Sequence, residues 1–264
     1  MVKSFNWKIF FILVGAATFG LIAIIPYSLA LQAETLKRVQ LPMPLPLLMT
    51  IQIAEQVLMF ALVIAIGLFF ANRSGLGMPI LSARLNGESV AGKILKVLPI
   101  SIALGVIASL LIIALDVYIF QPALVAELGN KASVLSSASA ATPAAWKGFL
   151  ASFYGGIDEE ILLRLCLMSF LAWLGRFISK TSEGKPTLIV FWVANLLAAI
   201  LFGLGHLPAT SLLLTITPLV ITRAIVLNGL AGIAFGYLYF TRGLESAMIS
   251  HFSADIILHV LFAL

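Results

Sequence analysis

Charge is what this sequence has least of. Only 10 % of its 264 residues are charged and 61 % are hydrophobic, whereas an ordinary soluble domain is about 25 % charged and about 45–50 % apolar. A soluble globule of this size cannot bury so much apolar surface. The composition therefore excludes a soluble enzyme, a disordered chain and a coiled coil. Long apolar runs without alternation predict an all-α, polytopic membrane bundle rather than a β-barrel.

Cysteine is almost absent as well. The single Cys166 excludes an internal disulfide and a cysteine-based metal site. No internal repeat, heptad, phosphate loop or extramembrane domain is recognisable in the sequence. In a membrane protein, a net charge of +5 usually reflects basic residues that set the orientation of the helices and contact anionic lipid headgroups. We therefore expect the lipid bilayer as a partner and no nucleic acid.

The uncharged runs predict about eight membrane-spanning helices. The first run is 23 residues long, enough to cross about 30 Å of hydrocarbon and longer than a typical signal-peptide core. The run over 186–222 has 37 residues, or about 55 Å as one helix, so we expect it to break near His206 and Pro208. The predicted spans are residues 9–31, 45–71, 97–120, 147–173, two within 186–222, 224–240 and 245–264, with a loop over 121–146.

Basic residues predict the orientation of these spans. With the N-terminus inside, the inner segments hold ten Lys and Arg residues and the outer segments hold five, which favours this orientation. The inner ten are Lys3, Lys8, Arg73, Arg84, Lys93, Lys96, Arg176, Lys180, Lys185 and Arg223. The outer five are Lys37, Arg38, Lys131, Lys147 and Arg242.

The fourth predicted span carries four charged residues within seven positions: Asp158, Glu159, Glu160 and Arg164. Facing lipid, they would cost about 10 kcal/mol or more on insertion scales. They must face the bundle interior or water, where such residues are functional candidates. Glu160 and Arg164 are i,i+4 neighbours and can form an ion pair, which by itself would be structural. Glu159 lies about 100° around the helix and can point elsewhere.

All three histidines lie in otherwise apolar sequence. Phe202 and His206 share one helix face, and so do His251 and Asp255. His259 continues the second face, but we expect it to be structural because it lies near the C-terminus.

Two chemistries suit these residues. Glu159 can act as a general base on a water that attacks a peptide carbonyl, with His206 positioning that water and with His251 and Asp255 stabilising the oxyanion. Alternatively, Glu and His side chains can bind Zn²⁺. A His-Glu-x-x-His spacing and a cysteine pair are both missing, so we expect no metal and no other cofactor.

Three short motifs carry a family resemblance. Residues 159–164 match EExxxR, residues 202–206 match FxxxH and residues 251–255 match HxxxN/D. Their order, each on its own span, resembles the CPBP family of intramembrane proteases. This family is also called the Abi or CAAX-protease-like family and includes the type II CAAX prenyl endopeptidases. The resemblance covers about residues 148–264.

The resemblance implies an intramembrane endopeptidase acting on a hydrophobic peptide or on the C-terminal tail of a protein. It implies that Glu159 and His206 activate water without a metal and that His251 and Asp255 form the oxyanion site. Glu160, Arg164 and Phe202 would then support them. We interpret residues 1–264 as a single transmembrane domain, with N-terminal spans and a loop over 1–146 and the catalytic core over 147–264.

Asp255 and the orientation each leave a question. An ionised aspartate cannot donate to an oxyanion, so Asp255 is either protonated or accepts the N–H of His251 and orients it; we favour the second. With the N-terminus inside, His206 and His251 lie toward the outer half of the membrane, whereas the site of the prenyl endopeptidases is reached from the cytosol.

Two other functions stay open. A proton- or ion-coupled transporter would need Glu55 and Asp116, although the clearest chemistry is confined to the C-terminal half. A non-catalytic immunity or maturation protein would bind a hydrophobic peptide without cleaving it. In each case we expect an integral protein of the bacterial cytoplasmic membrane, or of the endoplasmic reticulum if the source is eukaryotic.

Overall fold

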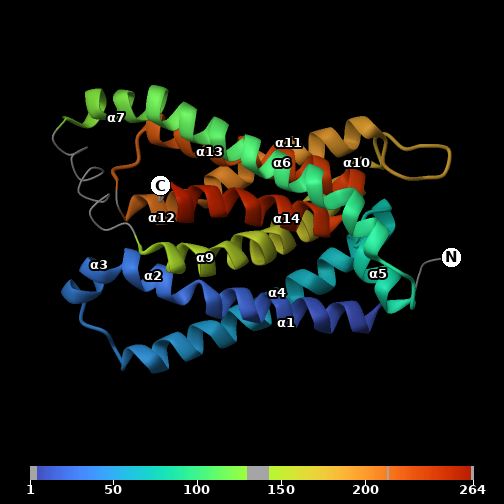
Figure 1. The fold of residues 1–264 in the computed structure, drawn as a ribbon, viewed down its shortest axis with the longest axis horizontal. Coiled ribbons are helices and arrows are strands. Elements are labelled where there is room, and N and C mark those ends of the chain that lie inside the picture. Colours follow the sequence, from blue (N-terminus) through green and yellow to red (C-terminus); the bar gives the residue numbers. More distant parts are fainter. Residues whose placement is uncertain (1–4, 130–142, 213, 263–264) are drawn as a thin grey trace.

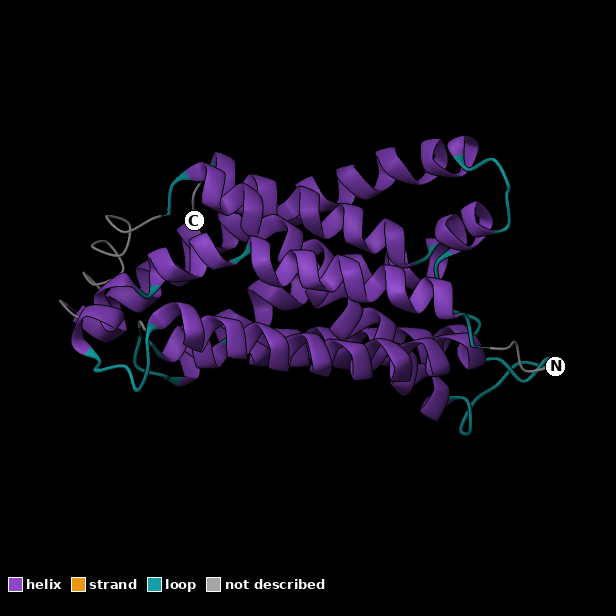
Figure 2. Cartoon of the chain, turned by 90° about the horizontal axis from the view of Figure 1, so that it is seen from below, coloured by secondary structure: helices purple, strands orange, loops and turns teal. Residues whose placement is uncertain are grey.

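The computed structural model describes residues 5–129, 143–212 and 214–262. Every regular element within these ranges is a helix, which confirms the predicted all-α bundle (Figures 1 and 2). The model has six helices that are long and apolar enough to cross a membrane. The chain is therefore an integral membrane protein.

The first half of the chain forms the first three membrane helices. A break at Ile24 separates the first two elements, and Pro26 lies in the first turn after it, where a proline costs no hydrogen bond. The fourth element ends at Gly75, which adopts a left-handed conformation with φ of 75°. The elements are α1 (Trp7–Ala23), α2 (Ile25–Leu31), α3 (Ala33–Arg38), α4 (Leu45–Ser74), α5 (Pro79–Leu85), α6 (Ala91–Leu115), η1 (Asp116–Phe120) and α7 (Gln121–Leu128).

The second half begins with one continuous helical stretch over residues 145–175, part of which is π-helical. Its elements are α9 (Ala145–Phe153), η4 (Tyr154–Glu159), η5 (Ile161–Met168) and α10 (Ser169–Gly175). The remaining elements are α11 (Leu188–Gly205), α12 (Leu207–Ser211), α13 (Pro218–Arg242), α14 (Leu244–Asp255) and η6 (Ile256–Leu261).

The described residues contain seven membrane-length helices, which is within one of the eight predicted. Six qualify by composition, and the stretch over 145–175 is the seventh, with charges that set it apart. The predicted break is confirmed because α11 ends at Gly205, but the short crossing expected after it is wrong. The chain there forms only the five residues of α12 before α13 begins at Pro218.

The predicted loop over 121–146 also begins later than expected. The helix continues through η1 and α7 to Leu128, and Pro122 is accommodated in the first turn of α7. Residues 130–142 of this loop lie outside the described residues.

The stretch over 145–175 runs through the centre of the bundle. Its η5 segment packs against α4, and its η4 segment packs against α1 and α14. In turn, α14 packs against α6 and α13 (Figure 1). Glycines allow this close packing: a Cβ at Gly105 would collide with the backbone of Ser250, and one at Gly203 would collide with Ile225. The helix that carries most of the buried charge is therefore covered by other helices.

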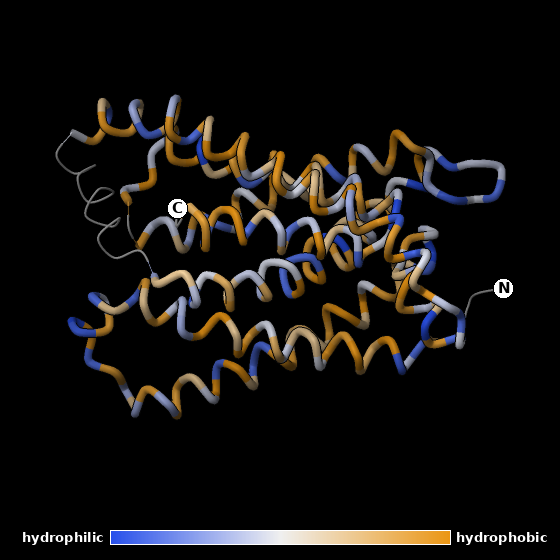
Figure 3. The backbone as a smooth tube through the Cα atoms, viewed as in Figure 1, coloured by the Kyte–Doolittle hydropathy of each residue, from blue (hydrophilic) through white to orange (hydrophobic). Residues whose placement is uncertain are grey.

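The two ends of the bundle differ in basic residues. One end holds the N-terminus, α5 and the α10–α11 loop, and the other holds α3, α12 and the C-terminus (Figure 1). Hydrophilic colours gather toward these ends (Figure 3). With seven helices, Arg223 and Arg242 exchange the sides predicted for them, so the ten-to-five balance is unchanged. The N-inside orientation stays a prediction; Lys3 and Lys131 lie outside the described residues.

Candidate active site

A buried ion pair lies on the π-helical part of the central helix. Nη1 of Arg164 is 3.0 Å from Oε1 of Glu160, and the two side chains are 1 % and 0 % exposed. Nη2 of Arg164 also donates to the carbonyl oxygen of Gly232 on α13, at 2.8 Å. The predicted pairing is confirmed. Since π-helical turns are rare and are frequent at functional sites, this segment marks where the chemistry is to be sought.

His251, on α14, is held in place by side chains of other helices. Its Nδ1 lies 2.8 Å from Oε1 of Glu160, and its ring stacks on Phe235 with centroids 4.5 Å apart. Its Nε2 faces two other carboxylates, at 3.6 Å from Glu159 Oε2 and 3.7 Å from Asp255 Oδ1. The hydrogen bond to Glu160 therefore fixes the imidazole so that Nε2 is the nitrogen left for chemistry.

Glu160, and not Asp255 as we expected, makes the hydrogen bond to the His251 ring. Oδ1 of Asp255 is too far from His251 Nε2, at 3.7 Å, to accept its N–H. The i,i+4 spacing within α14 suggested Asp255, but a carboxylate from the facing helix reaches the other ring nitrogen, Nδ1. The carboxyl of Asp255 instead lies against Gly155, where any Cβ would collide with Oδ2.

His206 directly follows α11, and one of its ring nitrogens already has a hydrogen-bond partner. Its Nδ1 lies 2.8 Å from the carbonyl oxygen of Phe202. A carbonyl only accepts, so Nδ1 carries the proton and the neutral ring keeps Nε2 as an acceptor. The ring also packs edge-on against Phe202, whose ring centroid is 5.7 Å from that of His251. Phe202 thus separates two histidines that line the same space.

That space is a cavity of about 230 Å³ in the half of the bundle that holds the C-terminus. All four residues predicted to be catalytic line it: Glu159, His206, His251 and Asp255. Phe202 also lines it, while Glu160 and Arg164 lie behind. Three membrane helices far apart in sequence therefore bring two carboxylates and two imidazoles to one cavity.

Tyr27 and His259 are among the cavity residues that were not predicted as part of the site. The hydroxyl of Tyr27, on α2, lies 3.4 Å from Nδ1 of His259, and Nε2 of His259 lies 3.9 Å from Oδ1 of Asp255. His259, which we expected to be structural, is thus a wall residue of the cavity. Its position eight residues after His251, on the same helix face, was the feature of the sequence that could have placed it in the site. Nothing in the sequence pointed to Tyr27.

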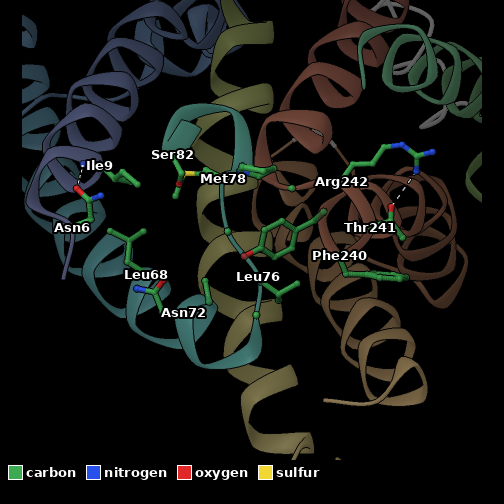
Figure 4. Close-up of a pocket in the computed structure, with 16 residues that line it drawn as sticks. Asn6, Ile9, Leu68, Asn72, Leu76, Met78, Ser82, Phe240, Thr241 and Arg242 are labelled. Atoms are coloured by element: carbon green, nitrogen blue, oxygen red, sulfur yellow. Dashed lines mark hydrogen bonds between the residues drawn. The ribbon is translucent and has the colours of Figure 1, made fainter. Parts of the chain in front are cut away.

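A larger cavity, of about 420 Å³, is lined by residues of α1, α4, α5 and α13 (Figure 4). Asn6, Leu68 and Asn72 are among its lining residues, and none of the motif residues lines it. Arg242, also at this cavity, donates to the hydroxyl of Thr241 at 3.3 Å (Figure 4). The motif residues therefore line the smaller of these two cavities, where the titratable groups converge.

Within the described residues, no group of three or more His, Cys, Asp or Glu side chains is arranged to hold a metal ion. The metal-free mechanism stays a prediction.

The two carboxylates required by a transporter lie elsewhere. Asp116 makes a bidentate ion pair with Arg223, at 2.6 and 2.8 Å, and accepts from Gln121 at 3.1 Å. Glu55 is exposed on α4. Among the described residues, neither of these two carboxylates lines the cavity that holds the histidines.

Part of the chain matches a known protein family. Residues 141–257 match the family model described as type II CAAX prenyl endopeptidase Rce1-like. The matched segment contains all three motifs and leaves α1 to α7, and with them Tyr27, outside; His259 follows it. No curated protein and no solved structure matches the chain.

Proposed function

Because the chain carries a domain of the CAAX-protease-like family over residues 141–257, we propose that it is an intramembrane endopeptidase. Its substrate would be a hydrophobic or membrane-associated peptide. The observation that carries this proposal is the convergence of Glu159, His206, His251 and Asp255 on one cavity within a membrane bundle.

Glu159 and His206 would activate the attacking water. His206 Nε2 accepts one hydrogen bond from this water, because Nδ1 is bound to the carbonyl of Phe202. Glu159 takes the proton as the water oxygen attacks the peptide carbonyl carbon. The same carboxyl then returns the proton to the leaving amine when the C–N bond breaks. At 23 % exposure, Glu159 is the carboxylate of its cluster that water can reach.

His251 would stabilise the oxyanion formed by this attack. In its doubly protonated form, Nδ1 donates to Glu160 and Nε2 donates to the oxygen on which negative charge develops. Asp255 can add a second donor as the neutral acid, since the orientation of His251 is already set by Glu160. His259, 3.9 Å from Asp255, and Tyr27, 3.4 Å from His259, line the same cavity.

A cleavage assay tests the function directly. We expect purified protein in liposomes to cleave a quenched fluorescent peptide with an apolar sequence, and to do so equally in the presence of a chelator such as phenanthroline. Parallel peptides with and without a prenylated C-terminal cysteine distinguish the two substrate classes. A chain that binds such peptides but never cleaves them would instead be a non-catalytic binding protein.

Two substitutions of Asp255 test whether its carboxyl acts by donating a hydrogen bond or by carrying a negative charge. We expect Asp255→Asn to cleave within about tenfold of the wild-type rate, because an amide N–H can donate in place of the neutral acid. We expect Asp255→Leu to lose about 10²–10³ in kcat, the usual cost of an oxyanion donor. The measurement is kcat for both variants under one set of conditions. If Asp255→Asn were as inactive as Asp255→Leu, the carboxyl itself would be required and the donor role would be wrong.

A further inference from the structure

A third cavity, also of about 230 Å³, forms a groove between α4 on one side and α1 and α2 on the other. Its walls are mostly apolar, with Leu48 and Met49 from α4, but they include Gln52 and Gln56. Ile24 lines both this groove and the catalytic cavity. Ile24, the residue that separates α1 from α2, therefore lies between the two spaces.

Gln52 and Gln56 are unusual residues for their position. They lie i,i+4 on one face of α4, a helix with a mean hydropathy of 2.3. Both are exposed, and neither side chain has a hydrogen-bond partner among the described residues. Polar side chains within a bilayer are costly, and they usually bond to a neighbouring segment. The two amides therefore lack the partner that their environment requires.

The amides lie at the depth of the catalytic cavity. At a rise of 1.5 Å per residue, Gln52 and Gln56 are about 10 and 16 Å along α4 from Leu45. By the same rise, Asp255 and His251 are about 9 and 15 Å from Leu261. The helix α4 begins at the same end of the bundle at which the chain ends (Figure 1). A segment held by the glutamines would thus be level with the catalytic residues.

We propose that this groove binds the substrate of the protease: an extended apolar peptide segment whose backbone pairs with Gln52 and Gln56 while the scissile bond passes Ile24 into the cavity. This inference rests on the proposed function. A peptide bond must leave its helix to be attacked, and its freed N–H and C=O groups then need partners within the membrane. A glutamine amide offers both a donor and an acceptor, whereas a lipid acyl chain has nothing to pair with it.

The double variant Gln52→Leu/Gln56→Leu tests this inference. Leucine keeps the apolar lining and the helix but removes both amides. We expect KM for an apolar peptide to rise at least tenfold with kcat within threefold, because the lost contacts lie away from the reacting atoms. The matched control is Glu55→Leu, which removes a polar group from the same helix outside the groove and should keep the wild-type KM.

A second variant approaches the groove from its other wall. Ser28→Trp, on α2, fills the groove without changing α4, and we expect the same rise in KM. An unchanged KM in both the double variant and Ser28→Trp would overturn the inference. So would a change from dimer to monomer in the double variant with KM unchanged, because the amides would then join two copies of the chain.

Binding distinguishes failure of this inference from failure of the proposed function. A labelled apolar peptide is titrated in nanodiscs against Glu159→Gln with and without the two leucine substitutions. Weaker binding on loss of the amides supports the groove even if the wild type cleaves no peptide, in which case only the protease assignment fails. Equal binding contradicts the groove whether or not cleavage occurs.

Discussion

Glu159→Gln is expected to lower the rate of peptide cleavage by about 10²–10⁴-fold, the usual contribution of a general base. Glutamine has nearly the same shape but cannot take the proton from water. The ion pair that Glu159 makes with His251 Nε2, at 3.6 Å, is too long to be a hydrogen bond, so the bundle should remain folded. The measurement is kcat with the quenched peptide in liposomes, with thermal unfolding as the check on folding.

The matched control is the same substitution on an exposed carboxylate. Glu55→Gln, on α4, should cleave at the wild-type rate. Equal cleavage by Glu159→Gln and wild type would remove the general base from the mechanism. Liposome ion flux that is abolished by Glu55→Gln would instead favour a transporter.

Glu160→Gln is expected to destabilise the protein by about 3–5 kcal/mol, the usual cost of leaving one member of a buried ion pair uncompensated. Arg164 is 1 % exposed and would keep its charge without the carboxylate that lies 3.0 Å away. The measurement is the free energy of unfolding in detergent. A loss below about 1 kcal/mol, typical of an exposed pair, would contradict this reading of the pair.

The double variant Glu160→Gln/Arg164→Met separates folding from catalysis. With neither charge left buried alone, we expect most of the stability to return. Cleavage should stay low, by about 10²–10⁴-fold, because His251 Nδ1 has lost the carboxylate that orients it; a triad with its carboxylate replaced behaves similarly. Recovery of full activity together with stability would mean that Glu160 serves folding alone.

The sequence was informative wherever helix spacing decides the outcome. The i,i+4 relation of Glu160 and Arg164 predicted their ion pair, and the three motifs predicted which helices carry the candidate site. Apolar runs predicted most of the membrane helices. The break before Pro208 was also predictable, because a 37-residue run exceeds the thickness of a bilayer.

Contacts between distant segments were out of reach of such reasoning. Glu160 and His251 are 91 positions apart, and no spacing rule connects them. Tyr27 reaches His259 across 232 positions, from outside the segment that carries the motifs. The short crossing expected before α13 was wrong because hydropathy does not show that the apolar residues after His206 turn back rather than cross the membrane.

The number of membrane helices determines on which side of the membrane each end of the chain lies. Seven crossings put residues 5 and 262 at opposite ends of the bundle (Figures 1 and 2). A fluorescent protein and an alkaline phosphatase, fused one to each end, would therefore meet different compartments. The candidate cavity lies in the half nearer the carboxyl end. The fusion at the carboxyl end therefore reports the compartment that is nearer the proposed cleavage site.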